Sequence, residues 1–263
     1  MRGTDTAGAP RPAVGRDDGH DLPGVHLRWL ALDEQTLDAE RLLPLLTAAE
    51  RERYEATSAA SVAERFVFGR VLLRMLAAEL TGGSASGIDV VACCAGCSGP
   101  HGRPRLEGAD PLLATLSVSV AHCAGAVVVA ASSAGVVGVD IEPAAGSAER
   151  GAQITRVAGA PFWVGAARPA DPILHWTRIE AVLKADGRGL EVDPHRVLIH
   201  ESRIAAEARI DGVRFRLAEP RLDPAFRVSV ALGPVEGRGT GPIIGWRREH
   251  SDALADSLVS AGR

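Results

Sequence analysis

The chain has 263 residues, of which 46% are hydrophobic and 24% are charged, and its formal net charge is −4. A slightly acidic chain has no overall basic field, so its composition gives no reason to expect a nucleic-acid partner. No apolar run is long enough to cross a bilayer, and four cysteines are too few for a disulfide scaffold at this length. We therefore expect a globular cytoplasmic protein without a membrane partner.

The first third of the chain predicts one strand and two helices. Residues 1–24 are rich in Gly, Ala, Pro, Asp and Arg and show no hydrophobic periodicity, so we expect a disordered tail. A short strand is predicted over 26–32, a helix over 34–55, and a second helix over 61–81 that ends at two glycines. Three arginines of the second helix lie off its apolar stripe and are expected to face solvent: Arg65, Arg70 and Arg74.

The remaining elements predict sheets on either side of a third helix. Strands are expected over 87–93, 116–122, 125–132 and 135–142, and later over 196–201, 213–219 and 226–233. Between them come a mixed connecting region, 143–172, and a helix from Pro172 to Asp186. Residues 234–263 are expected to be a loose tail. Because helices are followed by strands twice, we expect an α+β protein with subdomains at 25–134 and 135–233.

Two acidic residues interrupt a strand that otherwise consists of small and β-branched residues. In GVVGVDIEP, residues 135–143, Asp140 and Glu142 are two residues apart. Alternate residues of a strand point to the same side, so both carboxylates lie on one side of it. Since an ionised carboxylate is costly to bury without a partner, that side either faces water or holds a cation.

A third acidic residue lies on the helix predicted over 172–186. Glu180 and Lys184 are four residues apart and share a helical face with Trp176. Taken alone, the pair predicts only a surface ion pair. Taken with the two strand acids, it completes a set of hard oxygen ligands suited to Mg²⁺, beside a lysine that could meet the charge of a phosphate.

The composition of the chain also singles out Lys184, which is the only lysine among 29 lysine and arginine residues. A GC-rich genome would favour arginine, and one lysine could survive by chance. The alternative is a site that requires a compact ammonium group able to lose its proton, which an arginine guanidinium cannot do.

The combined pattern resembles the signature of the Sfp-type 4′-phosphopantetheinyl transferases. That signature has Val/Ile-Gly-x-Asp-x-Glu, a spacer, and Trp-x-x-Lys-Glu-x-x-x-Lys; this chain has VGVDIE, forty residues from Asp140 to Glu180, and WTRIEAVLK. Other stretches resembling the family are ERFVFGRVLLRMLAAEL (64–80), HGRPRL (101–106) and VSVAHCAG (118–125). The resemblance implies two pseudo-symmetric α/β subdomains, each a helix packed on an antiparallel sheet, with a metal site at their interface.

The resemblance also implies an activity. Such an enzyme transfers the phosphopantetheine arm of coenzyme A to a serine of an apo acyl or peptidyl carrier protein and releases adenosine 3′,5′-bisphosphate. Mg²⁺ is the implied cofactor and coenzyme A the co-substrate. The implied residues are Asp140, Glu142 and Glu180 as metal ligands, Glu180 as base and Lys184 as pyrophosphate contact and acid, and Arg103, His122 and, more weakly, Arg65 as nucleotide contacts.

The carrier proteins implied belong to fatty-acid, polyketide or peptide synthases, as in secondary metabolite biosynthesis. A carrier is expected to dock near the helix at 173–186 and the connecting region at 143–172, where Arg156 and Arg168 would attract its acidic helix. Because one chain supplies both subdomains, we expect a monomer.

Two positions depart from the family pattern, and they keep other functions open. Ile179 stands where the family often has a lysine, which could lower activity, and Ala121 stands where it has a serine. The missing serine would remove one hydrogen bond to coenzyme A, worth about 0.5–1.5 kcal/mol. One alternative is a non-catalytic relative that binds carrier proteins or coenzyme A. Another is a different Mg²⁺-dependent phosphate enzyme.

The stretch CCAGCSGPH offers a possible small zinc site. Its candidate ligands are Cys93, Cys94, Cys97 and His101. Adjacent cysteines rarely bind one ion together and no second pair follows, so free cysteines in a turn are the simpler interpretation. A phosphate-binding loop of the GxxxxGK type is absent from the sequence.

Overall fold

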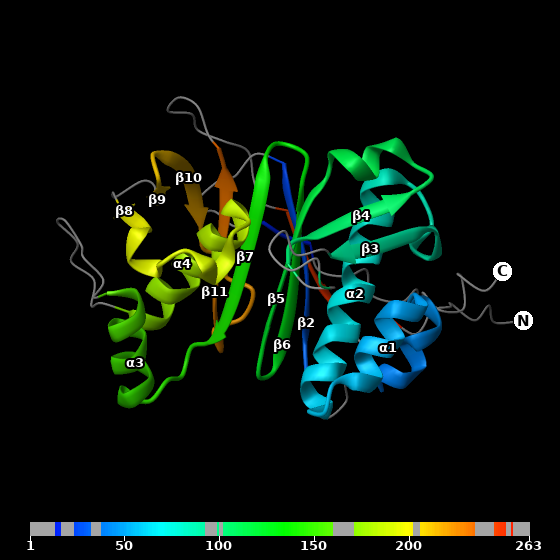
Figure 1. The fold of residues 1–263 in the computed structure, drawn as a ribbon, viewed down its shortest axis with the longest axis horizontal. Coiled ribbons are helices and arrows are strands. Elements are labelled where there is room, and N and C mark those ends of the chain that lie inside the picture. Colours follow the sequence, from blue (N-terminus) through cyan, green and yellow to red (C-terminus); the bar gives the residue numbers. More distant parts are fainter. Residues whose placement is uncertain are drawn as a thin grey trace, which may run out of the picture.

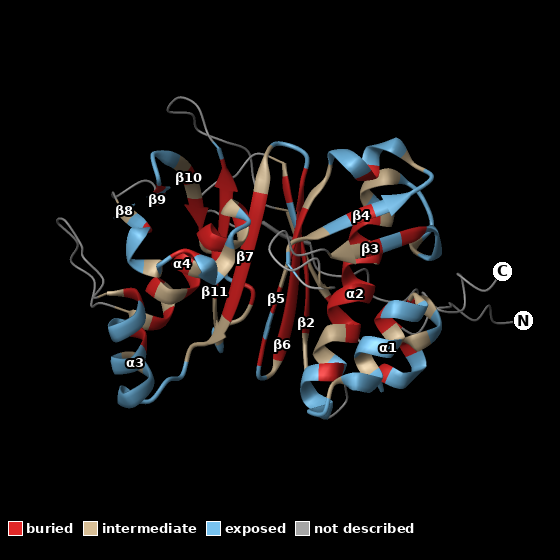
Figure 2. Cartoon of the chain, in the orientation of Figure 1, coloured by how far each residue is buried: buried red, intermediate tan, exposed pale blue. Residues whose placement is uncertain are grey.

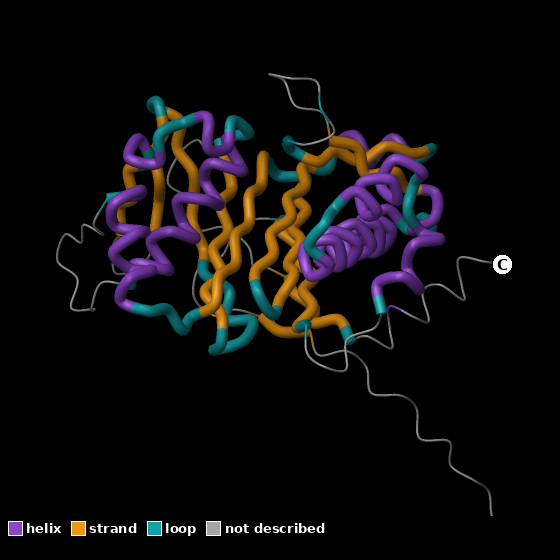
Figure 3. The backbone as a smooth tube through the Cα atoms, turned by 60° about the horizontal axis from the view of Figure 1, so that its bottom comes forward, coloured by secondary structure: helices purple, strands orange, loops and turns teal. Residues whose placement is uncertain are grey.

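The computed structural model of the chain describes residues 14–16, 24–32, 38–92, 99, 102–159, 171–201, 206–234, 245–250 and 254. Strands occupy the middle of the molecule, and helices lie on its two outer sides (Figures 1 and 3). This arrangement confirms the expected α+β class. The four residues considered for zinc, Cys93, Cys94, Cys97 and His101, lie outside the described residues.

The first sheet has five strands in the order β1-β12-β2-β6-β5. These are β1 (Val14–Arg16), β12 (Gly245–Glu249), β2 (Val25–Ala31), β6 (Ala126–Ser132) and β5 (Ser117–Cys123). The expectation of unstructured tails is wrong for β1 and β12. The expectation of a purely antiparallel sheet is also wrong for this sheet, because β12 pairs parallel with β2. Pairing with β12 satisfies backbone groups of β2 that would otherwise form an open sheet edge.

The second sheet has the order β7-β11-β10-β9-β8, and all its neighbours pair antiparallel. Its strands are β7 (Val136–Pro143), β11 (Phe226–Gly233), β10 (Val213–Ala218), β9 (Ala206–Ile210) and β8 (Leu198–Glu201). A separate hairpin consists of β3 (Ile88–Ala92) and β4 (Pro104–Gly108). The sequence patterns predicted neither β4 nor β9.

Two long helices, α2 (Ala60–Thr81) and α4 (Pro172–Asp186), cover the sheets from opposite sides. The two shorter α-helices described are α1 (Ala48–Ala56) and α3 (Ala148–Ala158). The short 3-10 helices are η1 (Ala39–Leu45), η2 (Ala85–Gly87), η3 (Pro111–Thr115), η4 (Gly189–Glu191) and η5 (Pro194–Arg196). The helix expected from Pro172 to Asp186 is confirmed as α4.

The single helix expected over 34–55 is wrong. The structure has η1, then a break, and then α1, while residues 33–37 lie outside the described part of the chain. Pro44 occupies the end of η1 and cannot donate a helical hydrogen bond. Thr47 then begins a new helix, because Thr47 and Glu50 form a reciprocal capping box.

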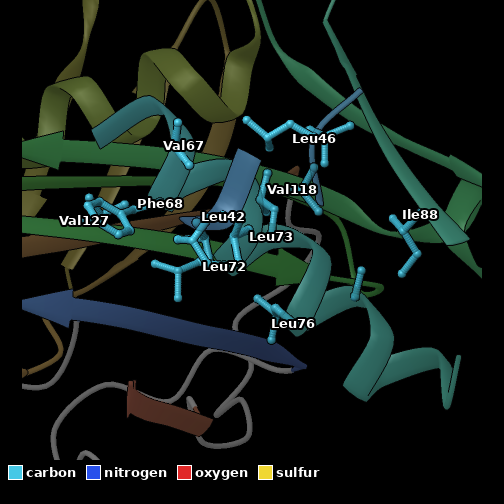
Figure 4. Close-up of a cluster of buried hydrophobic side chains, with 14 of the residues drawn as sticks. Leu42, Leu46, Val67, Phe68, Leu72, Leu73, Leu76, Ile88, Val118 and Val127 are labelled. Carbon is cyan, nitrogen blue, oxygen red and sulfur yellow. The ribbon is translucent and has the colours of Figure 1, made fainter. Parts of the chain in front are cut away.

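Three apolar clusters hold the layers together. One joins α2 to the first sheet; Figure 4 shows its centre, with Leu72, Leu73 and Leu76 of the helix. A second joins α4 to the second sheet, and a third lies between the two sheets, around the fully buried Trp29. Strand β6 is buried along its whole length, in accord with its apolar sequence from Ala126 to Ala131 (Figure 2).

Two of the arginines expected to face solvent are buried instead. Arg74 is 1% exposed, and its Nη2 lies 2.7 Å from Glu50 Oε2, while Arg70 Nε lies 3.5 Å from Glu50 Oε1. Glu50 comes from α1, so the carboxylate that makes the burial of these arginines tolerable belongs to a different helix. The solvent-facing prediction used only the periodicity of apolar residues along the helix. That periodicity does not show whether an acid on another helix neutralises a cation.

The two sheets meet along β5 and β7. Ser117 Oγ accepts a hydrogen bond from the Val137 N–H at 2.8 Å, and Ser119 Oγ accepts one from the Val139 N–H at 3.1 Å. The contacts advance together along both strands, so the strands run in the same direction. We call residues 117–123 and 136–143 the β5–β7 seam. Serine hydroxyls, rather than backbone carbonyls, make these two links between the sheets.

In the described part of the chain, no helix combines the length and apolar character needed to cross a membrane.

Candidate functional site

The seam includes two of the acidic residues that the sequence singled out, Asp140 and Glu142, and α4 packs directly on the strand that carries them. Gly138 permits this approach: a Cβ atom at this position would lie 2.0 Å from the Ala181 carbonyl oxygen and 2.5 Å from the Ala185 nitrogen. Only a residue without a side chain fits there. The glycine of VGVDIE therefore brings Glu180 and Lys184 of α4 to the strand that carries Asp140 and Glu142 (Figure 1).

Asp140 and Lys184 form a close ion pair across this contact. Lys184 Nζ donates to Asp140 Oδ1 at 2.6 Å and to the Val139 carbonyl oxygen at 3.2 Å. Asp140 is 7% exposed, and its second oxygen, Oδ2, is buried without a hydrogen-bond partner. Burial raises the pKa of the Asp140 carboxyl, and the Lys184 charge opposes that rise. A buried, unpaired carboxylate oxygen suits a ligand that brings positive charge.

Glu142 lies two residues farther along the strand and contacts a different cation. Arg150 of α3 donates from Nη2 to Glu142 Oε2 at 2.6 Å. Burial raises the pKa of Glu142, the Arg150 charge lowers it, and the Asp140 charge raises it further. The two strand acids are thus close enough to repel each other, as expected for residues on one side of a strand.

Glu180 completes the acidic group. It is half-buried on α4, and burial raises the pKa of its carboxyl, with the charges of Asp140 and Glu142 adding to the rise and that of Lys184 opposing it. The sequence placed these three acids on two segments forty residues apart, and the structure brings them into one electrostatic neighbourhood.

The donor chemistry of this group fits Mg²⁺, which prefers carboxylate oxygens and keeps several waters. The buried, unpartnered Asp140 Oδ2 supports the same assignment. In the arrangement described, however, no three His, Cys, Asp or Glu side chains of the described residues are grouped so that they could hold one ion. Two of the acids are instead directed to basic side chains, Lys184 and Arg150.

A basic pocket of about 180 Å³ lies on the α2 side of the seam. It is lined by Arg53, Arg65, Phe66, Gly69, Arg70, Gly102, Pro104, Val120 and His122. Arg53 and Arg70 stack on the Phe66 ring, with 4.6 and 5.0 Å from guanidinium carbon to ring centroid. The buried Arg65 Nε has no hydrogen-bond partner. Burial lowers the pKa of His122, and the charges of Arg65 and Lys184 lower it further.

The pocket contains two of the residues expected to contact a nucleotide, Arg65 and His122. Clustered cations, two of which, Arg65 and Arg70, have a buried Nε without a hydrogen-bond partner, form a site for a multiply charged anion. Sequence reasoning missed Arg53 and assigned Arg70 to solvent. Arg53 lies in the charged run ERERY, residues 50–54, which could have drawn attention to it. Only the fold shows that α1 places Arg53 in the same pocket as the arginines of α2.

Arg103, the third expected nucleotide contact, is already engaged by protein groups. Its Nη2 donates to Ser117 Oγ at 2.6 Å, and its Nη1 donates to the Ala185 carbonyl oxygen at 3.3 Å. It therefore links the loop before β4 to the seam and to the last turn of α4. A cation at a helix C-terminus is favourable, because the unpaired carbonyls there carry partial negative charge.

The two departures from the family pattern both lie in the core. Ile179 is 0% exposed and packs between α4 and the second sheet, so an apolar side chain is what this position requires. Ala121 is 3% exposed and belongs to the cluster between the sheets. It follows Ser117 and Ser119 in the alternation of β5, so a serine there would face the seam.

A larger cavity, of about 1230 Å³, lies near the beginning of α4 and contains none of the seven predicted site residues. Several of its charged groups pair with one another: Arg227 Nε lies 2.8 Å from Asp171 Oδ2, and Arg178 donates to Glu201 at 3.2 Å. These four charges are therefore already neutralised within the cavity.

Comparison of the chain with protein-family models and with curated proteins finds no match in either case.

Proposed function

We propose that the chain is a Mg²⁺-dependent 4′-phosphopantetheinyl transferase of the Sfp type. The observation that carries the proposal is the contact between VGVDIE on β7 and WTRIEAVLK on α4, which brings three acids and the only lysine together. The basic pocket across the seam gives a second, independent support, since coenzyme A carries several phosphate charges.

The proposal includes the finer description of the fold as two pseudo-symmetric α/β halves. In its support, each five-stranded sheet is covered by one long helix, α2 or α4, and the proposed site lies where the sheets meet. The extra strands β1 and β12 belong to the first sheet alone, so the symmetry concerns the central elements.

In this proposal Asp140, Glu142 and Glu180 would hold Mg²⁺ and Lys184 would bind the pyrophosphate of coenzyme A. Bound there, the metal would neutralise charge that develops on the pyrophosphate oxygens. Arg65 and His122 would hold nucleotide phosphates, and Arg103 would contact them only by leaving Ser117.

The chemical step exchanges two P–O bonds. The serine oxygen of the carrier bonds to the phosphorus that bears the pantetheine arm, and the bridging P–O bond to the nucleotide breaks. Glu180 takes the serine proton, for which its raised pKa is suitable, because a base with a pKa nearer to neutrality accepts a proton more readily. Lys184 donates a proton to the leaving phosphate oxygen, which an arginine could not do.

The direct test is mass spectrometry of an apo carrier protein incubated with the chain, coenzyme A and Mg²⁺. We expect the carrier to gain the mass of phosphopantetheine. Glu180→Ala removes the base and should lower the rate by at least about 100-fold. Glu142→Ala removes a metal ligand and should also abolish transfer. Lys184→Arg should keep nucleotide binding and slow turnover. Glu191→Ala changes an exposed acid outside the site and is the matched control.

Other outcomes distinguish the alternatives. An unmodified carrier together with measurable coenzyme A binding would indicate a non-catalytic relative. Hydrolysis of coenzyme A without a carrier would indicate a different phosphate enzyme. Full activity of Glu180→Ala would remove this residue both as base and as ligand.

The proposed partner is an acidic apo carrier protein, and the proposed docking surface is α3 with α4. Arg156 is exposed on α3 and is available for steering, whereas Arg168 lies outside the described residues. We propose that a single chain acts as a monomer.

A further inference from the structure

The beginning of α3 directs a cation at one of the proposed metal ligands. Ser147 caps this helix, and its Oγ accepts a hydrogen bond from the Arg150 backbone N–H at 3.2 Å. The cap fixes the first turn, and the side chain of Arg150 then reaches Glu142 at 2.6 Å. The proposed transfer reaction assigns no role to Arg150.

The two strand acids differ in how firmly their basic partners are held. Lys184 bonds Asp140 Oδ1 and the Val139 carbonyl, and it leaves Asp140 Oδ2 buried and unpartnered. The Arg150 side chain is 43% exposed, and the Glu142 side chain is 19% exposed. Arg150 can therefore turn into water, and the carboxylate that it leaves, Glu142, is itself partly exposed. Loss of Lys184, in contrast, would strip the more deeply buried Asp140 of its only ion-pair partner among the described residues.

At least one acid has to move before three of them can bind a single ion, because no such group is formed in the described residues. Glu142 is the acid whose partner leaves most easily. A divalent ion and a guanidinium would also repel each other at neighbouring carboxylate oxygens, whichever oxygen each of them uses.

We propose that Arg150 competes with Mg²⁺ for Glu142 and so sets the metal affinity of the site. This inference rests on the proposed Mg²⁺ site and adds a residue that regulates its occupancy. Arg150 holds the acid until a metal ion displaces it, and displacement frees the only contact between α3 and Glu142 that the described residues show. Occupancy of the metal site is thereby coupled to the side chain of a helix on the proposed docking surface.

The test is a titration with MgCl₂ alone at constant ionic strength, following the thermal unfolding midpoint, which rises when a ligand binds the folded state. We expect Arg150→Gln to bind Mg²⁺ about three- to tenfold more tightly than the parent chain, since one opposing charge is removed from a screened, half-exposed position. Arg150→Lys retains the charge and should stay close to the parent.

Arg156→Gln is the matched control, because it removes the same charge from the last turn of the same helix, where the side chain is exposed. Its Mg²⁺ affinity should equal that of the parent. The inference is overturned if Arg150→Gln binds no more tightly than the parent, if Arg156→Gln shows an equal gain, or if no variant responds to Mg²⁺. The carrier assay tests the proposed function separately. If the parent transfers phosphopantetheine but Arg150→Gln shows no gain in Mg²⁺ affinity, only this inference is refuted. If Arg150→Gln gains Mg²⁺ affinity but the parent transfers nothing, only the proposed function is refuted.

Discussion

Charged residues are buried at several places in this molecule, and at the residue scale they differ in whether every buried polar atom has a hydrogen-bond partner. Arg74 is 1% exposed and donates to Glu50, and Arg178 is 1% exposed and pairs with Glu201 and Glu219. Asp140 is buried to a similar degree, yet one of its oxygens has no partner. An unsatisfied buried group costs about 1–3 kcal/mol, so this arrangement is unfavourable for stability alone.

His175 gives a prediction about stability and pH. It is 8% exposed on α4, and its Nε2 lies 3.4 Å from the Ala158 carbonyl oxygen at the end of α3. Burial lowers the pKa of His175. The hydrogen bond to the Ala158 carbonyl raises this pKa in part, and the Arg178 charge lowers it further. In the unfolded chain the imidazole takes up a proton below about pH 6.5. The unfolded state therefore binds more protons than the folded state there, and the free energy of unfolding falls as the pH falls from about 6.5 through the lowered pKa.

Urea unfolding at a series of pH values would measure this effect. We expect His175→Gln to show a weaker loss of stability below about pH 6.5 than the parent, because glutamine does not titrate. His200→Gln changes an exposed imidazole and should retain the parental slope. An identical slope in the parent and in His175→Gln would exclude His175 as the source.

At the element scale, the site depends on the close contact of α4 with β7. We expect Gly138→Ala to destabilise the chain by about 3 kcal/mol, because the new Cβ meets backbone atoms of α4, which cannot rotate away. The change should also abolish transfer by displacing Glu180 and Lys184. The measurement is the urea midpoint combined with the carrier assay.

Gly87→Ala provides the control for this substitution. A Cβ at Gly87 would meet nothing within 4 Å, so the stability change should remain within about 0.5 kcal/mol. A stable and active Gly138→Ala variant would show that the helix can move off the strand without loss, so the glycine would not be what brings α4 and β7 together.

At the scale of the whole molecule, the last described strand, β12, is part of the first sheet. Strand β12 lies between β1 and β2, and Glu249 Oε1 lies 2.8 Å from Arg28 Nη1, where Arg28 is 6% exposed. Leu254 is 0% exposed and belongs to the cluster beneath α2. These contacts make the C-terminal region part of the N-terminal half of the fold.

A chain ending at Pro234 should therefore be much less stable than the parent. Loss of the strand opens an edge of β2 and leaves Arg28 without one of its two acidic partners, Glu79 and Glu249. We expect the unfolding midpoint to fall by about 10 °C or more, from the relation of about 2–4 °C per kcal/mol at this size. A chain ending at Leu254 keeps every described residue and is the control; equal midpoints for the two shortened chains would contradict the structural role of β12.

How much of the candidate site was predictable depends on the kind of signal that each residue gives. Asp140, Glu142, Glu180 and Lys184 stand out because acids within an apolar strand and a lone lysine on a helix violate the local pattern. Arg150 does not stand out, because an arginine in an exposed first turn is ordinary. Its contact with Glu142 appears only when the turn after β7 has been placed in space.

The sequence by itself determined the α+β class, the boundaries of α4 and the strand on which two acids share a side, because these follow from periodicities of two and 3.6 residues and from helix caps. Only the tertiary structure decided that α1 supplies the acid for Arg70 and Arg74, that residues 245–249 enter the first sheet as β12, and that Arg103 and Arg150 have protein partners. These facts rest on contacts between different elements, some of them far apart in the chain, such as Arg103 with Ala185, and one of them, Arg150 with Glu142, across a single turn. Local patterning carries no information about which distant charge neutralises a given residue.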